Sequence, residues 1–99
     1  MPGHGIIELV SSSSAPRTVA GFTLQQLDDE TLLYHAGLTK TIHLNETASL
    51  IWQLCDGQRT TEAIITTLQD AYPEHHDQIA GDVRRTLARL HHDGAIEFV

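Results

Sequence analysis

The spacing of apolar residues changes at Asn45, and this change constrains the fold more than any other feature of the sequence. Before Asn45, short runs alternate between apolar and polar residues, which favours half-buried strands; after it, apolar residues recur every three or four positions, which favours amphipathic helices. A chain of 99 residues has room for one compact domain. We therefore predict a single α+β domain with its strands first and its helices second.

The first half of the sequence predicts three short strands, at 19–27, 31–35 and 40–44. The turn-forming residues Asp28 and Asp29 separate the first two strands, and Ala36 and Gly37 close the second. Strands with such tight connections most simply form an antiparallel meander. The strand at 40–44 would then be an edge of the sheet.

The second half predicts three helices. Asn45 is a strong N-cap residue, and Glu46 follows in the first turn, where the helix dipole favours a carboxylate. A second helix follows Thr60, and a third runs from about 77 to 92 with an apolar stripe at Ile79, Val83, Leu87 and Leu90. Residues 95–99 favour one more short strand. This order is that of a winged-helix-like domain, a three-stranded antiparallel sheet followed by three helices.

The N-terminal region has a different character. Residues 1–17 are predicted to be a flexible tail, because the serine-rich segment at 11–16 can bury little surface, and the domain is predicted at 18–99. An apolar run at 6–10 could form an added or swapped strand. Terminal segments of this length are more often loosely held, which is the interpretation we favour.

Composition argues against several classes of function. The chain has 13 acidic and 6 basic residues and a formal net charge of −7, which disfavours general affinity for nucleic acid or for acidic membranes. No run is apolar for long enough to span a bilayer, and the start lacks a signal-peptide pattern. The one cysteine, Cys55, cannot form an internal disulfide, which suits a reducing compartment. We expect a soluble cytoplasmic protein, either a monomer or a homodimer.

The sequence contains no catalytic or metal-binding constellation. The pairs His75-His76 and His91-His92 lie at opposite ends of the third predicted helix, roughly 24 Å apart, too far for one coordination sphere. Cys55 shares the apolar face of the first helix and is interpreted as a buried thiol rather than a nucleophile. No common phosphate-binding, hydrolase or zinc motif is present. We therefore predict a binding function with no catalytic residue, no metal and no cofactor.

Two surfaces are candidates for binding. The strand at 40–44 could pair with an extended peptide, although Lys40 or the N-terminal tail could instead blunt or cover this edge. Its backbone groups alternate, so either Thr41 and His43 or the other set faces outward, and the sequence leaves both phases open. The second surface is the third helix, whose arginines are either a contact site for partners or simply solvated: Arg84, Arg85 and Arg89.

Two blocks of sequence follow each other at the start and the end of the first predicted helix: Leu44-Asn45-Glu46-Thr47-Ala48 and Asp56-Gly57-Gln58-Arg59-Thr60. Together they resemble the PqqD family of pyrroloquinoline quinone biosynthesis. The resemblance covers about residues 22–98. Two departures weaken the assignment to quinone biosynthesis itself: Tyr34 is followed by His35-Ala36-Gly37 rather than Pro-Glu-Gly, and Gly94 is followed by Ala95-Ile96 rather than an aromatic residue.

This resemblance implies a non-catalytic peptide chaperone. In that family the leader of a precursor peptide is added as an antiparallel strand to the third strand, beside the third helix, and is presented to a radical S-adenosylmethionine enzyme. Carried over to this chain, the pairing edge would comprise Thr39, Lys40, Thr41, Ile42, His43 and Leu44. The groove neighbours on the helix would be Val83, Arg84, Leu87 and His91. Separately from the resemblance, the exposed charges of Arg85 and Arg89 are expected to attract an acidic leader or the partner enzyme.

Two other classes of function stay open. A winged-helix DNA-binding regulator would use the second and third helices as a helix-turn-helix, but the start of its reading helix would contain Glu74, Asp77 and Asp82. Three carboxylates at that position disfavour contact with DNA. A structural subunit could use the same strand edge to associate with a second copy.

Overall fold

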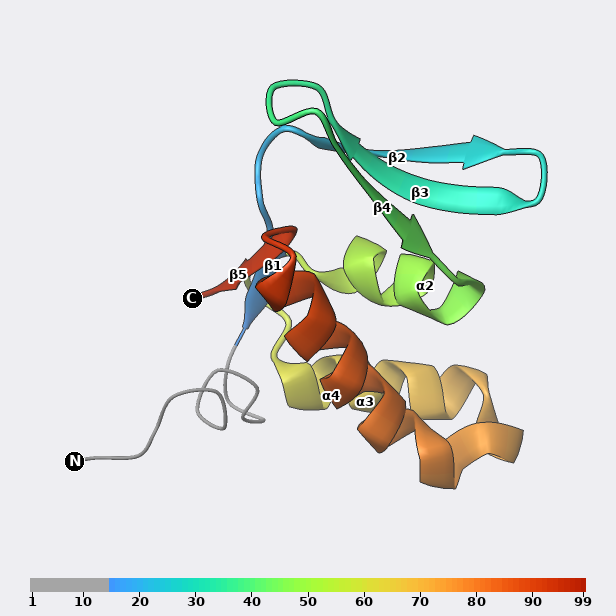
Figure 1. Cartoon of the computed structure of the whole chain (residues 1–99). Coiled ribbons are helices and arrows are strands. Elements are labelled where there is room, and N and C mark those ends of the chain that lie inside the picture. Colours follow the sequence, from blue (N-terminus) through green and yellow to red (C-terminus); the bar gives the residue numbers. More distant parts are fainter. Residues whose placement is uncertain (1–14) are drawn as a thin grey trace.

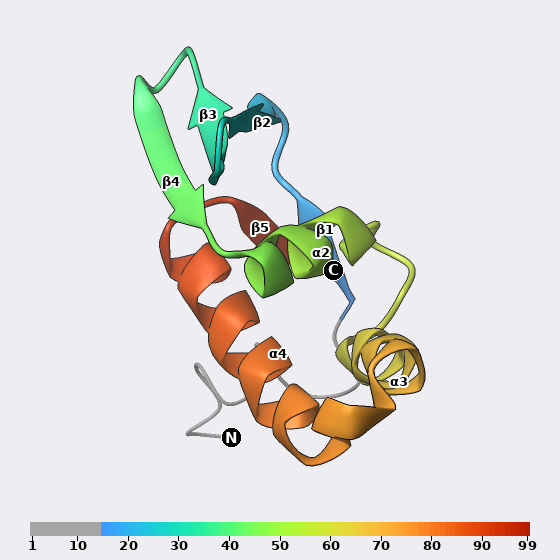
Figure 2. The same cartoon turned by 90° about the vertical axis from the view of Figure 1, so that its right-hand side faces the viewer.

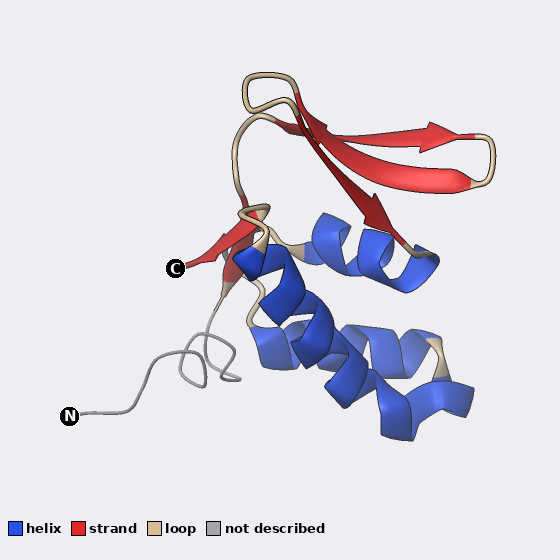
Figure 3. Cartoon of the chain, viewed as in Figure 1, coloured by secondary structure: helices blue, strands red, loops and turns tan. Residues whose placement is uncertain are grey.

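The computed structural model describes residues 15–99, and apart from one additional strand at the N-terminal end, their strands and helices follow the predicted order (Figures 1 and 3). The strands are β1 (Pro16–Thr18), β2 (Phe22–Leu27), β3 (Glu30–His35), β4 (Lys40–Leu44) and β5 (Ile96–Phe98). The helices are α2 (Glu46–Leu54), α3 (Thr61–Ala71), the short 3-10 helix η1 (Pro73–His75) and α4 (His76–His92). The α+β fold class, with three antiparallel strands followed by three helices, is confirmed.

The described strands form two separate sheets. The main sheet has the order β2-β3-β4, and each neighbouring pair is antiparallel, so the meander and the edge position of β4 are confirmed. The second sheet pairs β1 with β5, bringing the two ends of the domain together (Figure 1). The sequence predicted the short strand near the C-terminus but not its partner.

Strand β1 begins before the predicted start of the domain at Thr18. Pro16 lies opposite Phe98 and Thr18 opposite Ile96, and the side chain of Pro16 is fully buried. The predicted tail at 1–17 is therefore too long at its C-terminal end. Pairing with β5 makes Pro16 and Arg17 part of the domain, although their local composition suggests a linker. The apolar run at 6–10 lies outside the described residues.

The predicted starts of the first two helices are confirmed by their caps. The side chain of Asn45 accepts a hydrogen bond from the N–H of Ala48 at 2.7 Å, and the hydroxyl of Thr60 accepts one from the N–H of Ala63 at 3.1 Å. Each cap satisfies a backbone donor that the first turn of a helix leaves unpaired. Strand β4 therefore passes directly into α2 through one capping residue.

The turn between α2 and α3 accounts for the second block of the family resemblance. One carboxylate oxygen of Asp56 accepts the N–H groups of Gln58 at 2.9 Å and Arg59 at 2.8 Å, and these hydrogen bonds are the main reason that the pKa of Asp56 is lowered. Gly57 has a φ of +80°, which favours glycine, and donates its N–H to the carbonyl of Pro16 at 2.8 Å. The turn thus joins the helices and holds β1.

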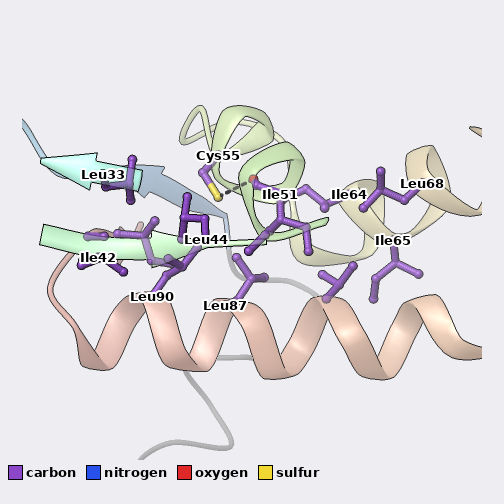
Figure 4. Packing of buried hydrophobic residues seen from close by; sticks show 14 of the residues in the cluster. Leu33, Ile42, Leu44, Ile51, Cys55, Ile64, Ile65, Leu68, Leu87 and Leu90 are labelled. Carbon is purple, nitrogen blue, oxygen red and sulfur yellow. Dashed lines mark hydrogen bonds between the residues drawn. The ribbon is translucent and has the colours of Figure 1, made fainter. Parts of the chain in front are cut away.

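Helix α2 packs against one face of the main sheet, α4 packs against α2 and α3, and the core lies between these elements (Figures 2 and 4). Leu33 of β3 and Ile51 of α2 are fully buried there. All four residues of the predicted stripe on α4 are buried as well: Ile79, Val83, Leu87 and Leu90. This stripe fixes which side of α4 faces the core and which side faces outward.

Candidate functional site

Within the described part of the chain, β4 pairs with β3 on one side and with no strand on the other. The guanidinium of Arg89, on α4, donates a hydrogen bond to the carbonyl of His43 at 2.8 Å. The carbonyl of His43 is therefore directed away from β3 and toward α4. Because backbone groups alternate along an antiparallel strand, Thr41 shares this outward phase, whereas Lys40, Ile42 and Leu44 pair with β3.

The β2–β3 turn gives the same phase independently. Leu27 and Glu30 flank the two residues Asp28 and Asp29, and a β-turn commonly closes with a hydrogen bond between its first and fourth residues. Every second residue of β3 from Glu30 onward, including Leu32, therefore forms its backbone hydrogen bonds with β2. The intervening residues of β3 form their backbone hydrogen bonds with β4. Leu33 and Ile42 are then a hydrogen-bonded pair, which leaves Thr41 and His43 facing outward.

The side chains of β4 alternate in burial. Ile42 and Leu44 are buried in the core, whereas Thr41 and His43 are exposed. The outward backbone groups of β4 thus belong to the residues with exposed side chains. The core residues of the same strand hold the edge in position.

Thr39 and Lys40 are occupied by contacts within the domain. Thr39 lies in the β3–β4 turn with a φ of +49°, and its N–H donates to the carbonyl of Ala36 at 3.2 Å. The predicted pairing edge is therefore too long at Thr39, whose donor is used in the turn. The Lys40 ammonium donates to the carbonyl of Asp93, which ties the start of β4 to the end of α4.

The groove neighbours predicted on α4 fall into two groups. Val83 and Leu87 have no exposed surface, so their prediction as residues that line an open groove is wrong: their place in the apolar stripe directs them into the core. Arg84 and His91 are half-buried and keep part of their surface accessible. The His91 ring also packs against Phe98 of β5, with ring centroids 5.3 Å apart.

The two arginines expected to contact partners have different environments. Arg85 pairs with Asp82 on the exposed side of α4. Arg89 bridges two elements: besides its hydrogen bond to His43, its guanidinium lies 3.7 Å from the carboxylate of Asp93. The contact between Arg89 and β4 joins residues 46 positions apart, which is why no local pattern in the sequence revealed it.

Cys55 is the one thiol of the chain, and its environment suppresses its reactivity. Burial, with a smaller contribution from the charge of Asp56, raises its pKa to about 12. Its Sγ donates to the carbonyl of Ile51 at 3.2 Å inside the core (Figure 4). The prediction of a buried core thiol is confirmed, because a protonated, enclosed thiol is a poor nucleophile.

No cluster of three or more metal-ligating side chains occurs among residues 15–99. None of the helices in the same region is long and apolar enough to cross a membrane. What the region does offer is an open strand edge with two donors and two acceptors, one acceptor already contacted by Arg89. Backbone groups in this arrangement can bind an extended chain without requiring particular side chains on it.

The fold and this edge define a winged-helix-like domain of the kind that presents an open strand beside its last helix. The chain belongs to the PqqD family: the family model for Coenzyme PQQ synthesis protein D (PqqD) matches residues 27–96. The resemblance inferred from the two sequence blocks is thereby confirmed.

Curated relatives carry the name PqqA binding protein. The protein from Pseudomonas aeruginosa is 37% identical over 71 residues, which cover 69% of this chain and 74% of the relative. The protein from Rahnella aquatilis is also 37% identical over 71 residues, covering 72% of this chain and 70% of the relative.

Two solved structures share the fold. The PqqD part of Methylobacterium extorquens PqqCD, described as a stand-alone recognition element for ribosomally synthesised and modified peptides, is 26% identical with a TM-score of 0.71 and covers 88% of this chain and 93% of its own. TbiB1 in complex with the TbiA(beta) leader peptide has a TM-score of 0.66 at 22% identity, covering 82% of this chain and 94% of its own. The second similarity concerns the fold alone.

Proposed function

We propose that this chain is a peptide chaperone that binds the leader of a precursor peptide, of the PqqA kind, as an added antiparallel strand along β4. The outward phase of Thr41 and His43 is the observation that carries the proposal, because it supplies backbone donors and acceptors at an edge that has no second strand partner in the described region. The names of the Pseudomonas and Rahnella relatives support the choice of ligand.

The proposed contact surface follows from the geometry of the edge. Thr41 and His43 provide the hydrogen bonds, and Ile42 and Leu44 anchor the strand from the core side. Arg84 and His91 on α4 supply accessible side-chain surface. Val83 and Leu87 contribute only by holding α4 against the core.

The proposal assigns no catalytic step to this chain. The bound leader would be handed to a separate modifying enzyme of the radical S-adenosylmethionine class in the cytoplasm, and Arg85, on the exposed side of α4, is the proposed contact for that enzyme. A monomer is sufficient for this function. A homodimer that pairs two β4 edges would compete with the peptide for the same backbone groups.

Calorimetric titration with synthetic PqqA from Pseudomonas aeruginosa, followed by amide hydrogen exchange, tests the proposal. We expect saturable binding and slower exchange at the N–H groups of Thr41 and His43, because both become hydrogen-bonded in the complex. The N–H of Gln26 on β2, at the opposite edge of the sheet, is the internal control and should not change. Binding without protection on β4 would contradict strand addition.

Duplex DNA provides the test of the rival function. The winged-helix regulator predicts sequence-specific retardation of DNA that weakens with salt, whereas the peptide chaperone predicts no more binding than a comparably acidic control protein. No relative reported above is described as a DNA-binding protein. Specific DNA binding together with absent PqqA binding would favour the regulator.

A further inference from the structure

A cavity lies where the first half of α2 meets the end of α3, η1 and the first half of α4. It has a volume of about 440 Å³, within the range of pockets that hold small ligands or a few side chains. Apolar residues from all three helices line it, with the fully buried Val83 beneath them: Leu50, Leu68, Tyr72 and Ile79. Tyr72 is 39% exposed, and it leaves apolar surface open to solvent.

The charged residues lining this cavity are acidic. Glu46 of α2, Glu74 of η1 and Asp82 of α4 contribute carboxylates, and no lysine or arginine lines it. Asp82 is paired with Arg85, and His75 is the remaining titratable group besides Tyr72. An occupant that fits this surface carries an apolar side chain for the centre and a positive charge for the margin.

The cavity continues from the end of β4. Glu46, which lines it, is separated from Leu44 by the capping residue Asn45 alone. Asp82 lies seven residues before Arg89 on α4, so the cavity begins roughly 10 Å along the helix from the residue that contacts His43. An extended peptide covers this distance with about three residues.

We propose that this cavity receives the part of the leader that precedes the strand paired with β4, through one apolar side chain with a lysine or arginine beside it. The inference rests on the proposed function, since the N-terminal end of an antiparallel added strand lies beside Leu44, at the end of β4 nearest the cavity. The cavity would add sequence specificity, because backbone hydrogen bonds alone distinguish poorly between peptides of different sequence.

Site-specific photo-crosslinking tests the proposal with PqqA from Pseudomonas aeruginosa. The photoreactive amino acid p-benzoylphenylalanine replaces Tyr72, Thr41 or Leu27 in three separate proteins. Leu27, which is 56% exposed at the end of β2, is the control for chance contact. We expect cross-links from positions 41 and 72 but not from position 27. The peptide residue captured at 72 should lie N-terminal to the one captured at 41.

The outcomes separate this inference from the proposed function. Cross-linking from position 41 without any from position 72 would overturn the cavity assignment and leave strand addition intact. Capture of the modifying enzyme instead of the peptide at position 72 would also overturn it. Absence of cross-links from both positions would refute both proposals.

A charge reversal tests the acidic margin. Glu74→Lys should weaken PqqA binding about threefold to fivefold at low salt and less at high salt, as expected for a partly solvated charge. Asp70→Lys is the matched control, because Asp70 is exposed on α3 outside the cavity. Equal weakening by both variants would mean that net charge, rather than this cavity, attracts the peptide.

Discussion

Arg89 already occupies one of the acceptors that strand addition requires, so its removal should tighten peptide binding. Its guanidinium donates to the carbonyl of His43 at 2.8 Å, and an arriving strand must displace or share this bond. A hydrogen bond from a charged donor contributes roughly 1.5–3 kcal/mol, and solvent screening at the half-exposed Arg89 side chain reduces this to about 1 kcal/mol. We predict that Arg89→Ala binds PqqA about fivefold more tightly.

Calorimetric titration at low and high salt separates this effect from electrostatic attraction. Arg85→Ala is the matched control, because it removes the same charge from the same helix, while Arg85 pairs with Asp82 rather than with β4. At high salt, attraction of an acidic peptide to either arginine is screened, and the gain from Arg89→Ala should persist. If Arg89→Ala binds no more tightly than Arg85→Ala at high salt, then Arg89 does not compete for the strand edge.

Four further predictions concern stability and reactivity. Leu87→Ala should lower the free energy of unfolding by about 3 kcal/mol in denaturant titrations, because its side chain is fully buried, whereas Leu38→Ala, at a side chain that is 63% exposed, should change it little. Asn45→Ala should cost about 1 kcal/mol in thermal melts through loss of the α2 cap. The thiol of Cys55, with its pKa raised to about 12, should react with iodoacetamide far more slowly in the native protein than in denaturant. The same shift predicts that the free energy of unfolding falls as the pH rises from about 9.0, the pKa of the unfolded thiol, toward 12, because the unfolded thiol ionises first. Because the pKa of Asp56 is lowered in the folded state, its carboxylate should stabilise the fold at pH values above 3.8, the pKa of the unfolded group. Acidification below that pH should remove this contribution from the unmodified protein, whereas Asp56→Ala should show no such loss.

The main sheet and the helices could be predicted from the sequence because each depends on local signals. The change of period at Asn45, the turn residues at Asp28 and Asp29, and the cap at Thr60 all act within a few residues. Strand β1 carries no such signal. Its partner β5 lies about 80 residues away, and only the folded chain brings Pro16 opposite Phe98.

The candidate site was predictable as a location but not in its details. The edge position of β4 followed from the strand order, whereas its phase came from the register of the strand pairs and from the long-range contact between Arg89 and His43, which the sequence left open. Val83 and Leu87 were assigned to the groove although they belong to the same stripe that was predicted to be core. A residue in the middle of a buried stripe has little surface left for a ligand, and that consideration would have excluded both.

Proline substitution at the outward positions of β4 tests strand addition most directly, because proline removes a backbone donor. Thr41→Pro and His43→Pro each remove an N–H that faces away from β3, so both proteins should stay folded. Gln26→Pro is the matched control on β2. Gln26 lies opposite Thr31, and Thr31 forms its backbone hydrogen bonds with Leu44 of β4. The N–H of Gln26 therefore also faces outward, but at the opposite edge of the sheet.

The decisive measurement is the PqqA affinity of these three variants by calorimetric titration, with thermal melts as the check on folding. Strand addition at β4 predicts that Gln26→Pro binds like the unmodified protein and that Thr41→Pro and His43→Pro lose binding while remaining folded. If both β4 variants stay folded and bind PqqA with undiminished affinity, the peptide is not held by this edge.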